Sequence, residues 1–203
     1  MVVVIRVMIV DDGTWEPWDA PVGEPATTSD GADDTYAIEL GRARRKSGSD
    51  ESVTTGAGAI GGRRVAIVLG EFEFLGGSIG RDAGARIVAA VRRATRERLP
   101  LLAFPASGGT RMQEGTAAFL QMVAITGAVT DHKAAGLPYL VYLRHPTTGG
   151  VFASWGSLGH ITWAEPGALI GFLGPRVYEG LYGEPFPADV QTAENLVRTT
   201  VVD

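Results

Sequence analysis

Two glycine-rich turns carry the clearest potential for chemistry in this sequence. Ser107-Gly108-Gly109 follows the apolar run Leu101–Phe104, and Thr148-Gly149-Gly150 follows a second apolar run further along the chain. Where a strand passes through a glycine turn into a helix, backbone N–H groups are left without a helical carbonyl, and glycine lets a ligand approach them closely. Each such donor stabilises a developing oxyanion by roughly 3 kcal/mol. We expect the turns to converge on one oxyanion, with four candidate catalytic residues: Gly108, Gly109, Gly149 and Gly150.

Other catalytic groups are poorly supported. Ser107, Ser154 and Ser157 lack the Gly-x-Ser-x-Gly spacing of a nucleophile elbow. The three histidines are dispersed, no His-Glu-x-x-His motif is present, and cysteine is absent, so we expect neither a metal site nor thiolate catalysis. The letters Gly56-x-Gly58-x-x-Gly61 match a dinucleotide-binding pattern, but a strand is predicted where that motif needs a helix. We therefore reject a dinucleotide site.

The composition indicates an ordinary globular protein. The chain has 203 residues, 45% of them hydrophobic and 20% charged, which suits about one domain. A formal net charge of -5 gives no indication of nucleic acid or an anionic membrane as partner. We find no signal peptide and no uncharged stretch of membrane-spanning length. These features fit a cytoplasmic protein.

Local patterns predict alternating strands and helices. Strands are expected at 2–10, 52–60, 63–73, 101–104, 138–143, 160–164, 168–172 and 199–203. Helices are expected at 35–46, 81–98, 113–135, 151–158, 174–182 and 192–198. Residues 1–34 are predicted to form a partly flexible arm, and 35–203 the folded domain. Within 113–135, we expect Phe119, Val123 and Thr126 on one buried stripe, widened by Met122 and Ile125.

The helix expected at 35–46 carries a dense group of cations. Asp33 and Asp34 are predicted to cap its start. Its last turns hold four basic residues: Arg42, Arg44, Arg45 and Lys46. Cations at a helix C-terminus complement the helix dipole, so a solvated face explains them. Contact with phosphate is the alternative, and the sequence leaves both open.

The repeat of strand, glycine turn and helix predicts an α/β fold. In such folds ligands bind at the turns beyond the strand ends. The linear pattern does not separate a doubly wound sheet from a spiral of ββα units.

Four segments in order resemble one family. They lie at 72–80, 106–115, 146–151 and 164–176, and they are similar to the carboxyltransferase component of biotin-dependent acyl-CoA carboxylases. The likeness is to its N-terminal, β-subunit-like half and runs from about Asp11 to Asp203. It implies a crotonase-type spiral of ββα units. It also implies transfer of a carboxyl group from carboxybiotin, held on a carrier protein, to an acyl-CoA; acetyl-CoA would give malonyl-CoA.

The resemblance assigns roles to named residues. Glycine N–H groups would hold the thioester enolate, Gly149 and Gly150 more surely than Gly108 and Gly109. The CoA groove would be lined by the turn at 74–78 together with Ser107 and Arg111, giving these binding residues: Phe74, Gly76, Gly77, Ser78, Ser107 and Arg111. No metal is implied, since the four-cysteine zinc ribbon usual in bacterial β subunits is absent.

The resemblance also implies partners. The family's active site lies between this half and a C-type, α-like half, and biotin arrives on a biotin carboxyl carrier protein. We therefore expect a homo- or hetero-oligomer with a large apolar interface, and little activity from this half alone. The chain stops in what we expect to be a continuing strand, as a truncated half would. Two alternatives remain open: a subunit of a biotin-independent malonyl-thioester decarboxylase, and a non-catalytic subunit that binds CoA or aids assembly.

Overall fold

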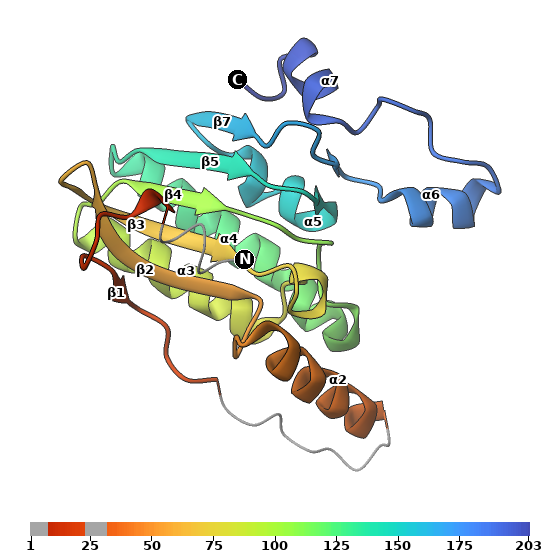
Figure 1. Ribbon diagram of the computed structural model, residues 1–203, viewed down its shortest axis with the longest axis horizontal. Coiled ribbons are helices and arrows are strands. Elements are labelled where there is room, and N and C mark those ends of the chain that lie inside the picture. The colour runs from red at the N-terminus through yellow and green to blue at the C-terminus, as the bar shows by residue number, and fades with distance from the viewer. Residues whose placement is uncertain (1–7, 23–31) are drawn as a thin grey trace.

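A central sheet organises the chain. The computed structural model describes residues 8–22 and 32–203, and within these residues six strands form one sheet in the order β1-β2-β3-β4-β5-β7 (Figure 1). Their bounds are β1 Glu16–Pro17, β2 Val53–Ile60, β3 Arg63–Gly70, β4 Leu101–Phe104, β5 Tyr139–Leu143 and β7 Ile161–Ala164. β1, β2 and β3 pair antiparallel, whereas β3, β4, β5 and β7 are parallel. β2 and β3 form a hairpin, so a strand follows the glycine pattern at 56–61 where a dinucleotide-binding motif would need a helix.

Helices α3 (Arg81–Arg96) and α4 (Gly115–Ala134) pack side by side against one face of this sheet (Figure 1). The core between them and the parallel strands includes Val68 and Val141 from the sheet and Ile87 and Ile125 from the helices, all at most 1% exposed. Near-continuous apolar strands such as β3 are expected where helices or other segments cover a parallel sheet. Helix α2 (Ala32–Ser47) lies outside this layer, beside the turn that follows β3.

The C-terminal part of the chain is built from short elements. β6 (Thr147–Thr148) and β8 (Ile170–Gly171) form a small parallel sheet, and α5 (Gly149–Phe152) starts directly after β6. α6 (Pro175–Tyr182) and α7 (Ala193–Arg198) follow. The Thr192 Oγ1 accepts from the Asn195 N–H at 3.3 Å, so Thr192 caps the start of α7.

Several predicted elements are confirmed and others are corrected. The strand at 101–104 and the helices at 81–98 and 174–182 occur nearly as predicted. The strand expected at 63–73 ends at Gly70, and the one at 168–172 shrinks to Ile170–Gly171. The helix expected at 151–158 is the single turn α5 followed by a 3-10 turn at Trp155–Ser157. α2 begins at Ala32, so Asp33 and Asp34 lie inside its first turn rather than before it.

The two terminal strands are also corrected. Residues 199–203 form a turn and an irregular segment, in which the Asp203 N–H donates to the Thr162 carbonyl at 2.8 Å. Met8 and Ile9 are helical, whereas residues 2–7 of the strand predicted at 2–10 lie outside the described residues. Part of the predicted arm is ordered, because Glu16 and Pro17 pair with β2.

The buried stripe of α4 was also predicted wrongly in part. Met122 and Ile125 are buried, but Phe119 is 60% and Val123 64% exposed. The sequence pattern is apolar nearly all round this helix, so periodicity could not tell the face against the sheet from the face against solvent.

Candidate active site

The two glycine turns lie side by side. Ser107 and Thr147 form a parallel bridge, the Thr148 N–H donates to the Ser107 carbonyl at 2.8 Å, and the Ser107 N–H donates to the Pro146 carbonyl at 2.7 Å. A Cβ placed on Gly109 would sit 3.5 Å from the Gly150 nitrogen, and one on Gly149 would sit 3.3 Å from the Gly108 carbonyl oxygen. These distances confirm that the two turns meet, whereas their convergence on one oxyanion stays a prediction.

A pocket of about 660 Å³ opens over both turns. Its floor is formed by the four glycines together with Thr110 and Thr148. Its walls are apolar, with Phe119 from α4, Phe172 from the segment that leads into α6, and Val177 from α6 itself. A concave, mainly apolar site with a few backbone donors is the usual form of a small-molecule site.

The N–H groups of the four glycines are not equivalent. The Gly108 N–H donates to the Gly76 carbonyl at 2.8 Å, and the Gly109 N–H donates to the Ser107 Oγ at 3.0 Å. The Gly149 N–H donates to the Phe172 carbonyl at 3.1 Å. Gly150 is the second residue of α5, whose first-turn N–H groups have no carbonyl partner within the helix. Its N–H is therefore the best-placed donor for a ligand in the pocket.

Glycine is needed here for two different reasons. Gly149 has φ +64° and Gly109 has φ +112°, conformations that side chains make costly. Gly150 has no such φ, but a Cβ there would lie 3.2 Å from both Thr110 Oγ1 and Met122 Cγ. At Gly150, glycine keeps the backbone accessible and the pocket floor open.

The turn at 74–78 braces the first glycine turn. Gly77 has φ +65°, and a Cβ on it would overlap the Ala106 carbonyl oxygen. The Ser107 Oγ donates to the Gly77 carbonyl at 2.6 Å. Phe74 is fully buried. Gly76, Gly77 and Ser107 therefore fix the shape of the site from beneath it.

Arg111 is a buried structural cation in this conformation. Its side chain is 1% exposed and ion-paired with Glu51, which is 2% exposed. Its guanidinium also donates to the Ser78 carbonyl at 2.8 Å and to the Ser78 Oγ at 3.3 Å. Burial alone would lower the pKa of Arg111, but the hydrogen bond and charge of Glu51 outweigh it and raise the pKa. The predicted place of Arg111 in the groove stays a prediction; the structure places its head group under the 74–78 turn.

Tyr36 and Glu114 extend this buried network to α2. The Tyr36 hydroxyl donates to Glu114 at 2.5 Å, and the Arg81 N–H at the start of α3 donates to the same carboxylate at 2.6 Å. Burial raises the pKa of Tyr36, as does its bond to Glu114. Burial would also raise the pKa of Glu114, but the donors Tyr36 and Arg81 outweigh it and lower the pKa. Sequence reasoning missed Tyr36 and Glu51, which lie far from Arg111 in the chain and belong to no local motif.

Two features are absent from the described residues. Among them, no group of three or more His, Cys, Asp or Glu side chains is arranged to hold a metal ion. In the same part of the chain, none of the helices combines the length and apolarity that crossing a membrane requires.

This fold and site define a class of protein. The sequence matches the carboxyl transferase domain family over residues 31–200, which is most of the chain. The chain belongs to this family, as the resemblance implied.

Individual relatives agree with this assignment. A probable biotin-dependent acyl-coenzyme A carboxylase beta3 subunit of Mycobacterium tuberculosis is 65% identical over 200 residues, covering 98% of this chain and 39% of the relative. An acetyl-coenzyme A carboxylase carboxyl transferase subunit beta of Caulobacter vibrioides is 44% identical over 195 residues, covering 95% of this chain and 63% of the relative. The chain thus spans less than two thirds of the length of these relatives.

Solved structures show the same fold at low identity. A structure of transcarboxylase 12S, with methylmalonyl-coenzyme A and methylmalonic acid bound, superimposes with a TM-score of 0.79 at 24% identity, over all of this chain and 37% of that one. A Pseudomonas malonate decarboxylase hetero-tetramer gives a TM-score of 0.78 at 20% identity, over 98% of this chain and 73% of the matched chain. The fold is thus the carboxyltransferase, crotonase-like α/β fold.

Proposed function

We propose that this chain is the acyl-CoA-binding half of a carboxyltransferase that moves a carboxyl group from carboxybiotin to an acyl-CoA. Acetyl-CoA, which would give malonyl-CoA, is the acceptor that we favour. The observation that carries the proposal is the pocket over Gly108, Gly109, Gly149 and Gly150, in a chain of the carboxyl transferase family. The relatives' names support biotin dependence and acyl-CoA as acceptor, and one of them names acetyl-coenzyme A.

The pocket suits formation of an enolate from a thioester. Loss of a proton from the carbon next to the thioester carbonyl places negative charge on the carbonyl oxygen. The Gly150 N–H is proposed to meet that oxygen, and because the donor is fixed by the fold it costs no reorganisation when the charge develops. Phe119, Phe172 and Val177 are each more than half exposed, so a partner that covers these apolar walls would exclude water and strengthen the hydrogen bond. Carboxybiotin on a separate carrier protein would supply the carboxyl group as its nitrogen–carboxyl bond breaks, and the freed biotin nitrogen would take up the proton lost by the acyl carbon. We assign no residue of this chain to biotin.

Apolar surface around the pocket supports a partner for this half. Phe119, Val123, Phe172 and Leu181 are each at least 60% exposed. Exposed apolar residues gathered at a site commonly mark an interaction surface. We propose a C-type, α-like half as the occupant of this surface, with a biotin carboxyl carrier protein as the third component of a homo- or hetero-oligomeric enzyme.

Replacing Gly150 tests the proposed donor. In Gly150→Val the new side chain would crowd Thr110 and Met122 and cover the N–H, so we expect carboxyl transfer in the assembled enzyme to fall at least ~100-fold, the effect of losing one oxyanion donor. The circular dichroism spectrum should stay close to that of the wild type. Gly127→Ala is the matched control, because Gly127 lies in α4 and a Cβ there meets nothing within 4 Å. Full activity of Gly150→Val would refute the oxyanion role.

Avidin separates this function from the biotin-independent alternative. If avidin abolishes turnover of acyl-CoA by the assembled enzyme, transfer depends on biotin. Avidin-insensitive release of carbon dioxide from a malonyl thioester would instead identify a decarboxylase subunit. If no mixture with a partner half turned over any acyl-CoA, the chain would be a non-catalytic subunit.

A further inference from the structure

Thr110 follows the first glycine turn and lines the pocket that opens over both turns. Its backbone is fixed on either side, because the Ile79 N–H donates to the Gly109 carbonyl at 2.9 Å and the Arg111 N–H donates to the Ile79 carbonyl at 3.0 Å. The Thr110 Oγ1 would lie 3.2 Å from a Cβ placed on Gly150. The hydroxyl therefore lies next to the backbone that carries the proposed oxyanion donor.

The hydroxyl of Thr110 forms no hydrogen bond with any residue that the structure describes. Neighbouring hydroxyls are bonded to the protein. The Ser107 Oγ donates to the Gly77 carbonyl at 2.6 Å, and the Ser154 Oγ donates to the Gly150 carbonyl at 2.5 Å. Because Thr110 is only half-buried and lines the pocket, its O–H is available to a ligand.

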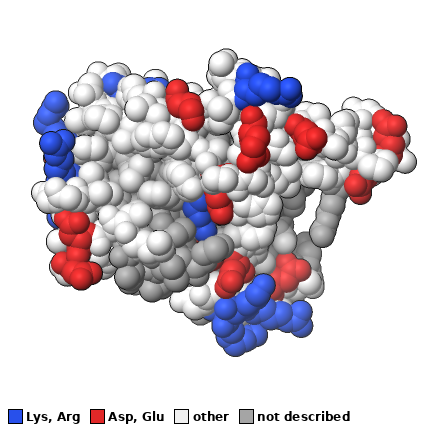
Figure 2. Space-filling view, turned by 45° about the horizontal axis from the view of Figure 1, so that its top comes forward, with Lys and Arg blue, Asp and Glu red and all other residues white. Residues whose placement is uncertain are grey.

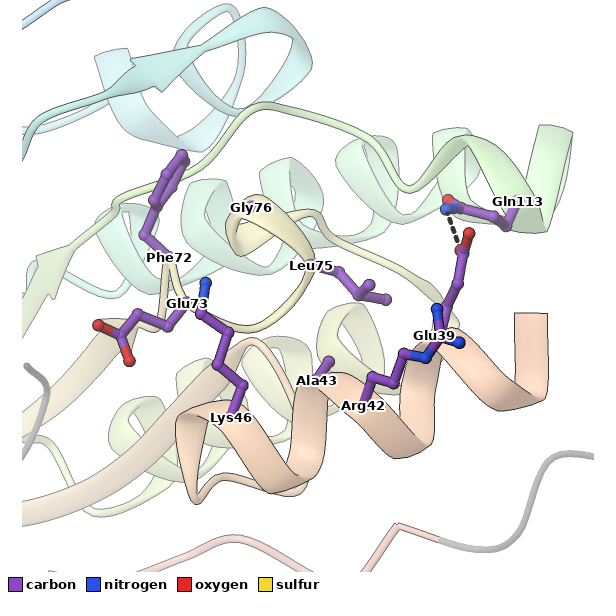
Figure 3. A pocket seen from close by; sticks show the side chains of 9 residues that line it. All are labelled: Glu39, Arg42, Ala43, Lys46, Phe72, Glu73, Leu75, Gly76 and Gln113. Atoms are coloured by element: carbon purple, nitrogen blue, oxygen red, sulfur yellow. Dashed lines mark hydrogen bonds between the residues drawn. The ribbon is translucent and has the colours of Figure 1, made fainter. Parts of the chain in front are cut away.

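The pocket over the glycine turns is uncharged. Among the residues whose side chains the structure describes, no charged one lines it. Arg42 and Lys46 line a separate pocket, between α2 and the turn that follows β3 (Figure 3). Figure 2 shows Lys and Arg atoms gathered at the lower edge of the molecule, where α2 lies. In this part of the chain, the groups that can meet a negative charge over the glycines are therefore N–H and O–H donors.

The four glycines supply fewer donors than their number suggests. The N–H groups of Gly108, Gly109 and Gly149 are bonded within the protein, which leaves the Gly150 N–H among the four. An oxyanion has several lone pairs, and sites that stabilise one combine backbone N–H groups with side-chain donors such as hydroxyls. The Thr110 hydroxyl, beside Gly150, can supply the second hydrogen bond.

We propose that Thr110 is a catalytic residue whose hydroxyl donates a hydrogen bond to the enolate oxygen of the acyl thioester, together with the Gly150 N–H. The proton stays on the Thr110 Oγ1, so no covalent bond forms or breaks there. Since threonine is restricted at χ1 and the backbone is held by Ile79, the donor needs little reorganisation as the charge develops. This role rests on the proposed function, because it takes the thioester to lie in this pocket.

Replacement of Thr110 in the assembled enzyme tests this role. Thr110→Val keeps the shape of the side chain and removes the hydroxyl, so we expect kcat for carboxyl transfer to fall roughly tenfold or more. KM for the acyl-CoA should stay within about twofold, because the contact strengthens only as charge develops. Thr110→Ala should lose as much activity as Thr110→Val. Thr110→Ser retains the hydroxyl on a less restricted side chain and should keep at least about a third of the wild-type kcat.

Thr130→Val is the matched control. Thr130 is exposed on α4, and its Oγ1 donates to the Thr126 carbonyl of the same helix at 2.9 Å. Its kcat and KM should stay within about twofold of the wild type, as expected for an exposed position. Thermal unfolding of each variant shows whether it is folded, and the smaller Thr110→Ala keeps the test valid if valine disturbs the turn.

The outcomes separate this role from the function beneath it. Unchanged kcat in Thr110→Val and Thr110→Ala would overturn it and leave the oxyanion to backbone N–H groups. It would also be overturned by an equal loss in Thr110→Ser, or by a change confined to KM. In each of these cases, carboxyl transfer by the wild-type enzyme would leave the proposed function standing. A wild-type assembled enzyme that transferred no carboxyl group to any acyl-CoA would instead refute the proposed function itself.

Discussion

The two glycine turns look alike in sequence but are held in different ways. In the turn at 107–109 the glycine N–H groups form hydrogen bonds within the protein. The Gly108 N–H donates to the Gly76 carbonyl, and the Gly109 N–H donates to the Ser107 Oγ. The turn at 148–150 leads directly into α5, which places the Gly150 N–H in a helical first turn. The turn at 107–109 therefore has a structural role, and the turn at 148–150 is the better candidate to donate a hydrogen bond to a ligand. A pair of glycines indicates a close approach of backbone, but the hydrogen bonds decide whether the approaching group is a ligand or another turn.

The turn at 107–109 also has more buried supporting contacts than the turn at 148–150. Beneath 107–109 lie the 74–78 turn and the buried Arg111–Glu51 pair. Beneath 148–150 lie the short strand β8 and the side chains of Met122 and Ser154. α5 is only one turn long, so its dipole is small and the site depends on individual N–H groups. Variants that remove a support should therefore affect stability at the first turn more than at the second.

Breaking the buried pair should have the largest effect on stability. Arg111→Met leaves the Glu51 carboxylate buried without its partner, and we expect the free energy of unfolding to fall by about 3–5 kcal/mol in urea denaturation. The double variant Arg111→Met/Glu51→Gln removes both charges and should recover part of this loss. A double variant as unstable as the sum of both single variants would show that the charges are not coupled.

Ser107 in the first turn and Ser154, which hydrogen-bonds to the second turn, allow a comparison of intermediate size. Ser107 is 1% exposed, and its Oγ both donates to the Gly77 carbonyl and accepts from the Gly109 N–H. Ser107→Ala leaves two buried groups unpaired and should cost about 2–3 kcal/mol. The Ser154 Oγ donates to the Gly150 carbonyl and lies 3.7 Å from the Met122 sulfur, a weak acceptor, at a partly exposed position, so Ser154→Ala should cost about 1 kcal/mol or less. Equal losses, measured by thermal and urea unfolding, would contradict the distinction between a braced and a lightly supported turn.

Sequence reasoning predicted the elements and the convergence of the turns because both depend on local patterns. Apolar runs give β3, β4 and β5, and glycine follows each of the two strands that lead to the site. The strand wrongly predicted at 199–203 was also inferred from a local pattern. Val201 and Val202 favour a strand, but Thr200 adopts φ +59°, and Asp203 accepts from the Thr162 N–H instead of extending a ladder.

The contacts that hold the site could not be predicted in the same way. Arg111 meets Glu51 sixty positions away, and Tyr36 meets Glu114 seventy-eight positions away. Nothing in the periodicity of either partner specifies the other, because pairing is decided by how α2 and the β2–β3 hairpin pack. The hydrogen bond from the Gly108 N–H to the Gly76 carbonyl could not be predicted from the sequence for the same reason. Residue types identified the turns, and only tertiary structure distinguishes the brace from the donor.

The smallest predicted effect is on the pH dependence of stability, and it concerns Glu114. The pKa of Glu114 is lowered from its ordinary value of 4.5 in the folded state, because the donors Tyr36 and Arg81 outweigh the effect of burial. A carboxylate with a lowered folded pKa stabilises the protein fully above its unfolded pKa, and that stabilisation is lost as the pH falls through the folded value. Glu114→Gln cannot ionise, so we expect it to be about 1–2 kcal/mol less stable than the wild type at pH 7.

That difference should shrink as the pH drops below about 4.5, the unfolded value. Urea denaturation of both proteins between pH 7 and pH 3 measures it. Glu179→Gln, at an exposed position on α6, is the control and should stay within about 0.5 kcal/mol of the wild type throughout. A difference between Glu114→Gln and the wild type that did not depend on pH would mean that the side chain acts through packing. Glu114 would then support α3 without its charge, and the buried charges that stabilise the first glycine turn would be those of Arg111 and Glu51 alone.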